Sequence, residues 1–167
     1  VSQVKTFLKE AEGKIKFLPR MNLVDKLWER NSGESSEKVF HLSNEISGES
    51  FSRKLNKILT ILKVNNIKNY IFCKPDAICW LLNIRGKDVA HNPVVNCFSI
   101  LRDSGEIIIF SENLDKFSEV KKKPLYRKIH FKKFSELRNF IINSKGSTGF
   151  DQNYLPWKIY QYLESSN

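Results

Sequence analysis

Two neighbouring segments near the middle of the chain, residues 94–101 and 106–110, are apolar at both alternating sets of positions. A strand with that pattern has no face suited to water, so covering layers must pack on both sides of its sheet. The four residues between the two segments, Arg102-Asp103-Ser104-Gly105, are typical of a hairpin turn. We therefore expect two central strands in a sheet that is covered on both faces.

Helical and strand patterns alternate through the second half of the chain, which favours an α/β fold with a mixed β-sheet flanked by helices. In helix 50–64, Ser50 is the expected cap and Lys54 falls outside the apolar face. Helix 76–82 is apolar nearly all round, so we expect Trp80 to be buried. The other expected helices are 1–12, 22–29, 113–121, 134–143 and one after Pro156, and the other expected strands are 15–18, 70–73, 126–129 and 148–150.

A small, polar stretch at residues 31–37 has the composition of a linker. It divides the 167 residues into residues 1–37, expected to be the end of a preceding domain with its linker, and residues 38–167, expected to be a complete domain. The sequence begins at Val1 without a secretory signal, which is the pattern expected of a fragment of a longer chain.

The cysteines and the hydropathy pattern indicate a cytoplasmic protein. Cys73, Cys79 and Cys97 form an odd number in apolar surroundings, so we expect reduced, buried thiols rather than disulfides. No apolar run approaches the roughly 20 residues that cross a bilayer, so we expect no membrane segment.

The net charge of +10 is concentrated in residues 116–138, which contain nine basic and two acidic residues. Phe117, Tyr126, Phe131 and Phe134 interleave with these cations, as in surfaces that stack on bases and bind phosphates. A stand-alone module that binds nucleic acid is therefore the alternative function. A solvated basic face over a packed core explains the same pattern more simply, and we favour that interpretation. The candidate basic surface consists of Lys121, Lys122, Lys123, Arg127, Lys128, Lys132 and Lys133.

Motifs for catalysis are not visible. His41, His91 and His130 lie far apart in the sequence, without the H-x-x-x-H or H-E-x-x-H spacing of a zinc site. The sequence also has no G-x-S-x-G turn and no glycine-rich phosphate loop. We expect this chain to be inactive by itself and to hold no metal or other cofactor.

The polar loop at residues 83–93 follows the most apolar helix and has the composition of a functional surface. Arg85 supplies a cation beside Gly86, and His91 and Asn92 supply donors and acceptors just before a central strand. These three polar residues are the candidate site. The alternative is structural: Arg85 pairs with Asp88, and Asn92 caps a turn.

Residues 76–94, Asp-Ala-Ile-Cys-Trp-Leu-Leu-Asn-Ile-Arg-Gly-Lys-Asp-Val-Ala-His-Asn-Pro-Val, closely resemble the D-x-I-x-W-L-x-N-x-R-G-x-D-x-x-x-N-P-V signature of long, three-domain Xaa-Pro aminopeptidases. Residues 22–28 resemble the segment that closes the first domain in that family. The resemblance implies that residues 38–167 form the second amino-terminal domain, with the ribonuclease H-like creatinase/prolidase fold. Ala90 departs mildly from the pattern.

The same resemblance implies a function for the longer protein. Members of the family remove the residue that precedes proline at the start of a peptide. They use two divalent metal ions, manganese or zinc, held by a catalytic pita-bread domain that would begin after Asn167. Their amino-terminal domains help to form the substrate cleft and the dimer. The resemblance therefore favours Arg85, His91 and Asn92 as residues that face this cleft.

Overall fold

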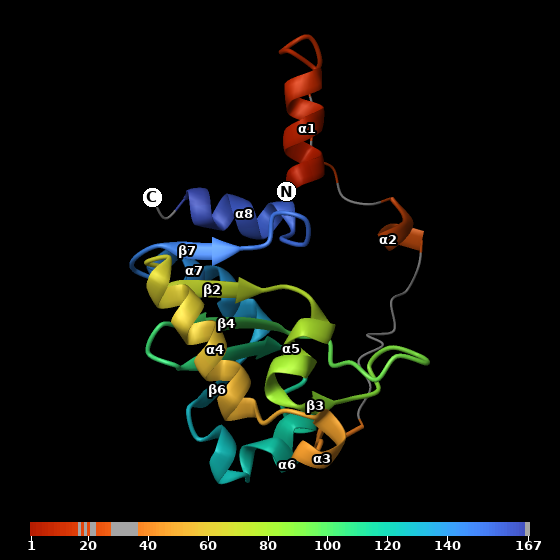
Figure 1. The fold of residues 1–167 in the computed structure, drawn as a ribbon. Coiled ribbons are helices and arrows are strands. Elements are labelled where there is room, and N and C mark those ends of the chain that lie inside the picture. The colour runs from red at the N-terminus through yellow and green to blue at the C-terminus, as the bar shows by residue number, and fades with distance from the viewer. Residues whose placement is uncertain (17, 19, 21–22, 28–36, 166–167) are drawn as a thin grey trace.

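The computed structural model describes residues 1–16, 18, 20, 23–27 and 37–165. A mixed five-stranded sheet forms its centre, in the order β6-β5-β4-β2-β7 (Figure 1). Strand β4 pairs antiparallel with β2 and β5, whereas β2 with β7 and β5 with β6 are parallel pairs. The strands are β2 (Asn69–Phe72), β4 (Phe98–Arg102), β5 (Ile107–Ser111), β6 (Ile129–Lys133) and β7 (Thr148–Phe150). The expected mixed sheet is confirmed, with the doubly apolar β4 in the middle.

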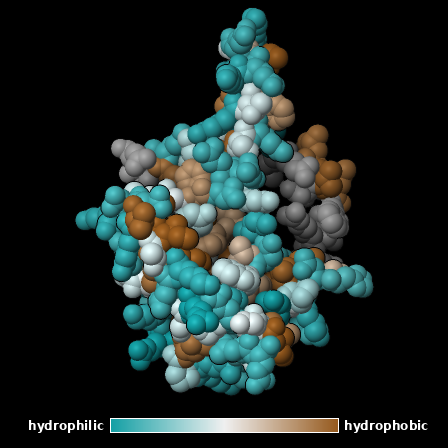
Figure 2. All heavy atoms as spheres, viewed as in Figure 1, coloured by the Kyte–Doolittle hydropathy of each residue, from teal (hydrophilic) through white to brown (hydrophobic). Residues whose placement is uncertain are grey.

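Two apolar clusters, one on each face of the sheet, form the core. Helices α4 (Phe51–Val64), α5 (Pro75–Leu82) and α6 (Ser118–Lys121) contribute to the first cluster. Helices α7 (Leu137–Asn143) and α8 (Trp157–Glu164) contribute to the second. Alternate residues of β4 divide between them, because Leu101 belongs to the first cluster and Ile100 to the second. The face that carries α4 and α5 is mostly hydrophilic outside, with only small separate apolar areas (Figure 2).

Three short elements beside α5 were not predicted. Strand β1 (Phe40–His41) pairs antiparallel with β3 (Ile84–Arg85), and α3 (Asn44–Ser47) follows β1. Two-residue strands and a four-residue helix are too short to produce a readable periodicity.

Several predicted boundaries are corrected. Residues 94–97 are loop rather than strand, so β4 begins only at Phe98. The strand expected at 126–129 lies at 129–133, because Lys123-Pro124 starts a short 3-10 helix, η2 (Pro124–Tyr126). The helices expected at 113–121 and 134–143 each begin as a 3-10 turn, η1 (Asp115–Phe117) before α6 and η3 (Phe134–Glu136) before α7.

The amino-terminal part of the chain lies outside the two-cluster core. Helix α1 (Ser2–Glu10) projects away from the sheet, and α2 (Val24–Leu27) is a single turn (Figure 1). Of the strand expected at 15–18, residues 15, 16 and 18 are not in a strand and residue 17 lies outside the described residues. Residues 31–36 of the linker expected at 31–37, and residues 22, 28 and 29 of the helix expected at 22–29, also lie outside them.

The cysteines are free thiols, as expected, although Cys73 is only partly buried. Burial raises the pKa of Cys73 to about 12, so this thiol is protonated at neutral pH. Within the described parts of the chain, the longest apolar helices fall short of what a membrane span requires.

Candidate functional site

Helix α5 ends where Asn83 takes a left-handed backbone conformation, with φ of 52°. The ammonium group of Lys54 donates to the Trp80 carbonyl at 2.9 Å and to Oδ1 of Asn83 at 2.6 Å. A cation here satisfies a terminal carbonyl and offsets the helix dipole. Lys54 is therefore only 2% exposed, which corrects the expectation that it lies outside the buried face of its helix. Burial lowers the pKa of this lysine.

Trp80 is 48% exposed, so the prediction that it is buried is wrong. A helix that packs on a sheet keeps one side outward, and Trp80 occupies that side. Its buried neighbours in α5 are Ile78, Cys79, Leu81 and Leu82. The ammonium group of Lys54 lies 4.7 Å from the Trp80 ring centroid, a cation–π contact. The indole therefore covers the buried lysine and leaves a large aromatic surface facing solvent.

Arg85 lies in β3, opposite Phe40 of β1, and is partly buried. Its guanidinium group donates to the carbonyls of Ile84 at 2.8 Å and Cys79 at 3.2 Å. The alternative in which Arg85 pairs with Asp88 is wrong, because the Asp88 carboxylate binds a different cation. Arg85 is thus held at the junction of α5 and the loop by backbone carbonyls.

Asp88 forms a buried ion pair with Lys116. The atoms Oδ2 and Nζ are 2.7 Å apart, and the two side chains are 1% and 0% exposed. The same carboxylate oxygen accepts from the backbone N–H of Asn96 at 2.7 Å. Residues 116–138 were expected to form a solvated basic face. For Lys116 this expectation is wrong, because its side chain is buried. The pair ties both ends of the 86–97 loop to η1.

Gly86 shows how closely the two ends of the loop approach each other. A Cβ atom at this position would lie 2.7 Å from Cγ2 of Val95 and 3.3 Å from the Val94 carbonyl oxygen. Only glycine therefore permits this packing.

The tip of the loop is an exposed tight turn. The Asn92 N–H donates to the Val89 carbonyl at 3.2 Å, and His91 has φ of 61°. His91 and Asn92 are both exposed. Among the described residues, no hydrogen bond joins either side chain to Arg85. The structure therefore places Arg85 at the fixed base of the loop, and His91 and Asn92 at its solvent-exposed tip.

The aromatic residues of the 116–138 segment do not form a stacking platform. Phe117 and Tyr126 are buried in the first core cluster, and Phe131 packs against that cluster. The candidate basic residues are exposed, apart from the partly buried Lys132, which pairs with Glu136 at 2.8 Å. The nucleic-acid interpretation therefore has no support from the structure.

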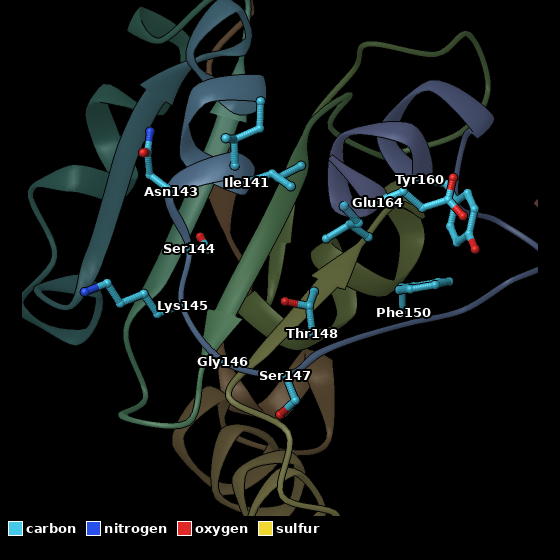
Figure 3. A pocket seen from close by; sticks show the side chains of 12 residues that line it. Ile141, Asn143, Ser144, Lys145, Gly146, Ser147, Thr148, Phe150, Tyr160 and Glu164 are labelled. Atoms are coloured by element: carbon cyan, nitrogen blue, oxygen red, sulfur yellow. The ribbon is translucent and has the colours of Figure 1, made fainter. Parts of the chain in front are cut away.

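Two surface pockets lie at opposite ends of the sheet. The larger, about 700 Å³, lies where β7 begins, with Phe150 and Tyr160 on one side and Ile141 on the other (Figure 3). Its Ser144 and Ser147 hydroxyls already donate to backbone carbonyls. The second, about 320 Å³, lies beyond the carboxyl ends of β2 and β5. Asn96 of the 86–97 loop lines this pocket, so the loop and the pocket lie at the same end of the sheet. Open α/β sheets bind ligands at the carboxyl ends of their strands.

A metal site requires several donor side chains in one place. In residues 1–16, 18, 20, 23–27 and 37–165, three or more His, Cys, Asp or Glu side chains nowhere gather in an arrangement that could hold a metal ion. A two-metal centre therefore does not fit the described residues.

Similar proteins point to one family. The model of the Creatinase/Prolidase N-terminal domain matches residues 30–167. A protein of Fusarium vanettenii named "Probable Xaa-Pro aminopeptidase P" is 30% identical over 149 residues, with 75% of this chain and 24% of that protein covered. A protein of the same name from Coprinopsis cinerea is 26% identical over 123 residues, with 73% of this chain and 20% of that protein covered.

Solved structures agree. The X-prolyl aminopeptidase of Caenorhabditis elegans, described as a cytosolic enzyme with a di-nuclear active site, is 29% identical with a TM-score of 0.62. The match covers 73% of this chain and 20% of that one. A creatinase/prolidase-like N-terminal domain from Corynebacterium diphtheriae shares the fold at 13% identity and a TM-score of 0.50, covering 70% of this chain and 87% of that one. The chain spans only a fifth to a quarter of the length of the aminopeptidases from Fusarium vanettenii, Coprinopsis cinerea and Caenorhabditis elegans. It belongs to the creatinase/prolidase N-terminal domain family.

Proposed function

We propose that this chain is a non-catalytic amino-terminal part of a metal-dependent Xaa-Pro aminopeptidase, which removes the residue before proline from peptides. The observation that carries the proposal is the family match over residues 30–167, together with relatives named Xaa-Pro aminopeptidase P. Residues 38–167 are the second amino-terminal domain, and residues 1–37 are the end of the first.

The two divalent metal ions, manganese or zinc, belong to a catalytic domain elsewhere in the longer protein. The di-nuclear active site named for the Caenorhabditis elegans relative supports this assignment. We further propose that this domain packs against its own catalytic domain, that the longer protein is a homodimer, and that it acts in the cytoplasm, as that relative does.

In this role the 86–97 loop forms part of the substrate cleft. The Asp88–Lys116 pair fixes its base, Arg85 is held beside that base, and His91 and Asn92 are presented at its tip. A rigid base with exposed polar groups is what orienting a peptide requires.

The experiment compares this chain with the longer protein in the hydrolysis of an Xaa-Pro peptide. We expect the longer protein to be active with added manganese or zinc and inhibited by a chelator, and this chain to be inactive under the same conditions. Metal-dependent turnover by this chain after repurification would contradict the proposal.

A variant tests the cleft. Arg85→Ala in the longer protein should lower kcat/KM for Xaa-Pro peptides, because an orienting cation is lost. Lys145→Ala, an exposed cation at the opposite end of the sheet, is the matched control and should leave kcat/KM unchanged. If kcat/KM is the same for Arg85→Ala, Lys145→Ala and the unsubstituted protein, Arg85 does not orient the substrate.

A further inference from the structure

The exposed turn between α6 and β6, residues 121–128, carries five cations and no acidic residue. We name it the basic turn; its cations are Lys121, Lys122, Lys123, Arg127 and Lys128, all of them exposed. Lys122 pairs with Glu119 at 2.9 Å, and Lys121 donates to the Leu114 carbonyl at 3.1 Å. No carboxylate of the described residues pairs with the other three cations. This surface is therefore short of negative charge.

The basic turn is rigid, because the residue at its centre is anchored in the core. Tyr126 is 2% exposed, and its ring packs against Phe51 with centroids 5.5 Å apart. Its hydroxyl donates to the Leu82 carbonyl at 2.6 Å, and its N–H donates to the Lys123 carbonyl at 3.0 Å. A fixed turn holds its cations in place before a partner arrives, so little conformational freedom is lost on binding.

The basic turn contacts β1, the strand that pairs with the one that carries Arg85. The Tyr126 hydroxyl also bonds to Nδ1 of His41, and β1, which contains His41, pairs with β3. Lys123 is close enough to help lower the pKa of His41, after the larger effect of burial. Helix α6, which leads into the turn, contacts β1. Strand β1 thus joins the basic turn to the strand that carries Arg85.

The chemistry of this surface favours an acidic polypeptide over the other polyanions. Proteins that hold single-stranded nucleic acid stack its bases on exposed aromatic rings, and here Phe117 and Tyr126 are buried. Amphipathic segments that lie in a membrane surface insert an apolar face, and Leu125, at 42% exposure, is the one large apolar side chain exposed between residues 121 and 128. A polypeptide is also the partner that the peptidase function proposed above supplies, and fixed cations can bind the carboxylates of an extended peptide.

We propose that the basic turn binds acidic stretches of polypeptide, and specifically the part of a peptide substrate that lies beyond its proline. This second part rests on the function proposed above. Cations that line one side of a cleft raise the local concentration of acidic peptides and their association rate, and salt weakens this effect.

The test is binding of fluorescein-labelled peptides to this chain, measured by fluorescence anisotropy. The probe is Gly-Pro followed by six glutamates, and its neutral counterpart has six glutamines. The turn variant is Lys123→Glu/Arg127→Glu/Lys128→Glu. The matched control, Arg53→Glu/Lys145→Glu/Lys158→Glu, makes the same change in net charge at exposed cations on other elements.

We expect the acidic peptide to bind about tenfold more tightly than the neutral one at low salt, and the turn variant to lose about that factor. The control variant should lose less than about threefold, since its cations lie elsewhere. Equal losses in both variants would mean that only net charge matters, which overturns the proposal. Tighter binding of an oligonucleotide or of phosphatidylserine vesicles, removed by the turn variant, would overturn it in favour of those partners.

A second measurement separates this proposal from the proposed function, because binding requires no hydrolysis. If the longer protein is active, the turn variant should lower kcat/KM for the acidic peptide and leave that for the neutral peptide unchanged. Equal effects on both peptides would refute the substrate assignment while the peptidase function stands. If the longer protein is inactive, the substrate assignment fails with the peptidase function, and the anisotropy result decides the binding of acidic polypeptide by itself.

Discussion

Removing one partner of the Asp88–Lys116 pair should destabilise the domain strongly. In Lys116→Met the Asp88 carboxylate, which is 1% exposed, loses its cation. It keeps the hydrogen bond from the backbone N–H of Asn96. Breaking a buried pair from one side costs about 3–5 kcal/mol, because the other charge stays desolvated. For a domain whose whole stability is about 5–15 kcal/mol, this is a large part.

The assay is equilibrium unfolding in urea, followed by tryptophan fluorescence. With an m-value of about 2 kcal/mol/M, the midpoint for Lys116→Met should fall by roughly 1.5–2.5 M. The double variant Asp88→Asn/Lys116→Met removes both charges, so its loss should be smaller than the sum of the single losses by more than about 1 kcal/mol.

The control is the solvent-accessible pair Lys132–Glu136, whose Nζ and Oε1 atoms lie 2.8 Å apart. Because both of its side chains reach solvent, Lys132→Met should change the free energy of unfolding by less than about 1 kcal/mol. If Lys116→Met costs no more than Lys132→Met, or if the two single losses are simply additive, the argument from burial is wrong.

Three further predictions test other parts of the structure. In urea unfolding, Trp80→Ala should lower the free energy of unfolding by about 1–2 kcal/mol and Leu82→Ala by about 3–5 kcal/mol. The difference is expected because Trp80 is half exposed and Leu82 is fully buried. Equal losses would contradict the orientation of α5. The Ser99 hydroxyl is buried without a hydrogen-bond partner among the described residues, so Ser99→Ala should raise the melting temperature or leave it unchanged, and a clear drop would reveal a missed partner. Burial, and to a smaller extent the charge of Lys123, holds the pKa of His41 below its usual value. As the pH falls below about 6.5, His41 is therefore protonated in the unfolded chain before it is protonated in the folded one. The free energy of unfolding should therefore decrease from pH 7 towards pH 5 and level off below the folded-state pKa; His41→Gln should flatten this slope, and an unchanged slope would contradict it.

The layers of the fold were predictable from the sequence because they depend on long apolar patterns. The doubly apolar segment that became β4 requires cover on both faces, and the helix that Ser50 caps shows a clear apolar stripe. The signature at residues 76–94 predicted the family for the same reason: many positions are constrained at once.

The contacts that hold the candidate site were not predictable in this way. Lysine is almost always exposed, so no pattern indicates that Lys54 and Lys116 are buried; each depends on a partner from a distant element, Asn83 and Asp88. Trp80 was misplaced because an apolar composition does not reveal which side of a short helix faces outward. The sequence offers one signal for the buried ion pair. Asp88 lies shortly before the apolar residues Val94 and Val95, where a charged side chain needs a partner.

The parallel pairing of β2 with β7 joins residues that lie almost half the chain apart, such as Asn69 and Thr148. A ribosome adds about 5–20 residues per second, so β2 waits roughly 4–16 seconds for its second neighbour. During that interval Ile71, which is buried in the finished domain, has neither α7 nor α8 to cover it. Strand β2 is then an open sheet edge beside an uncovered apolar face, the combination most prone to aggregation. This half-formed sheet is therefore the stage of synthesis at which the domain is most open to aggregation, and a chain that stops before Thr148 would remain in that state.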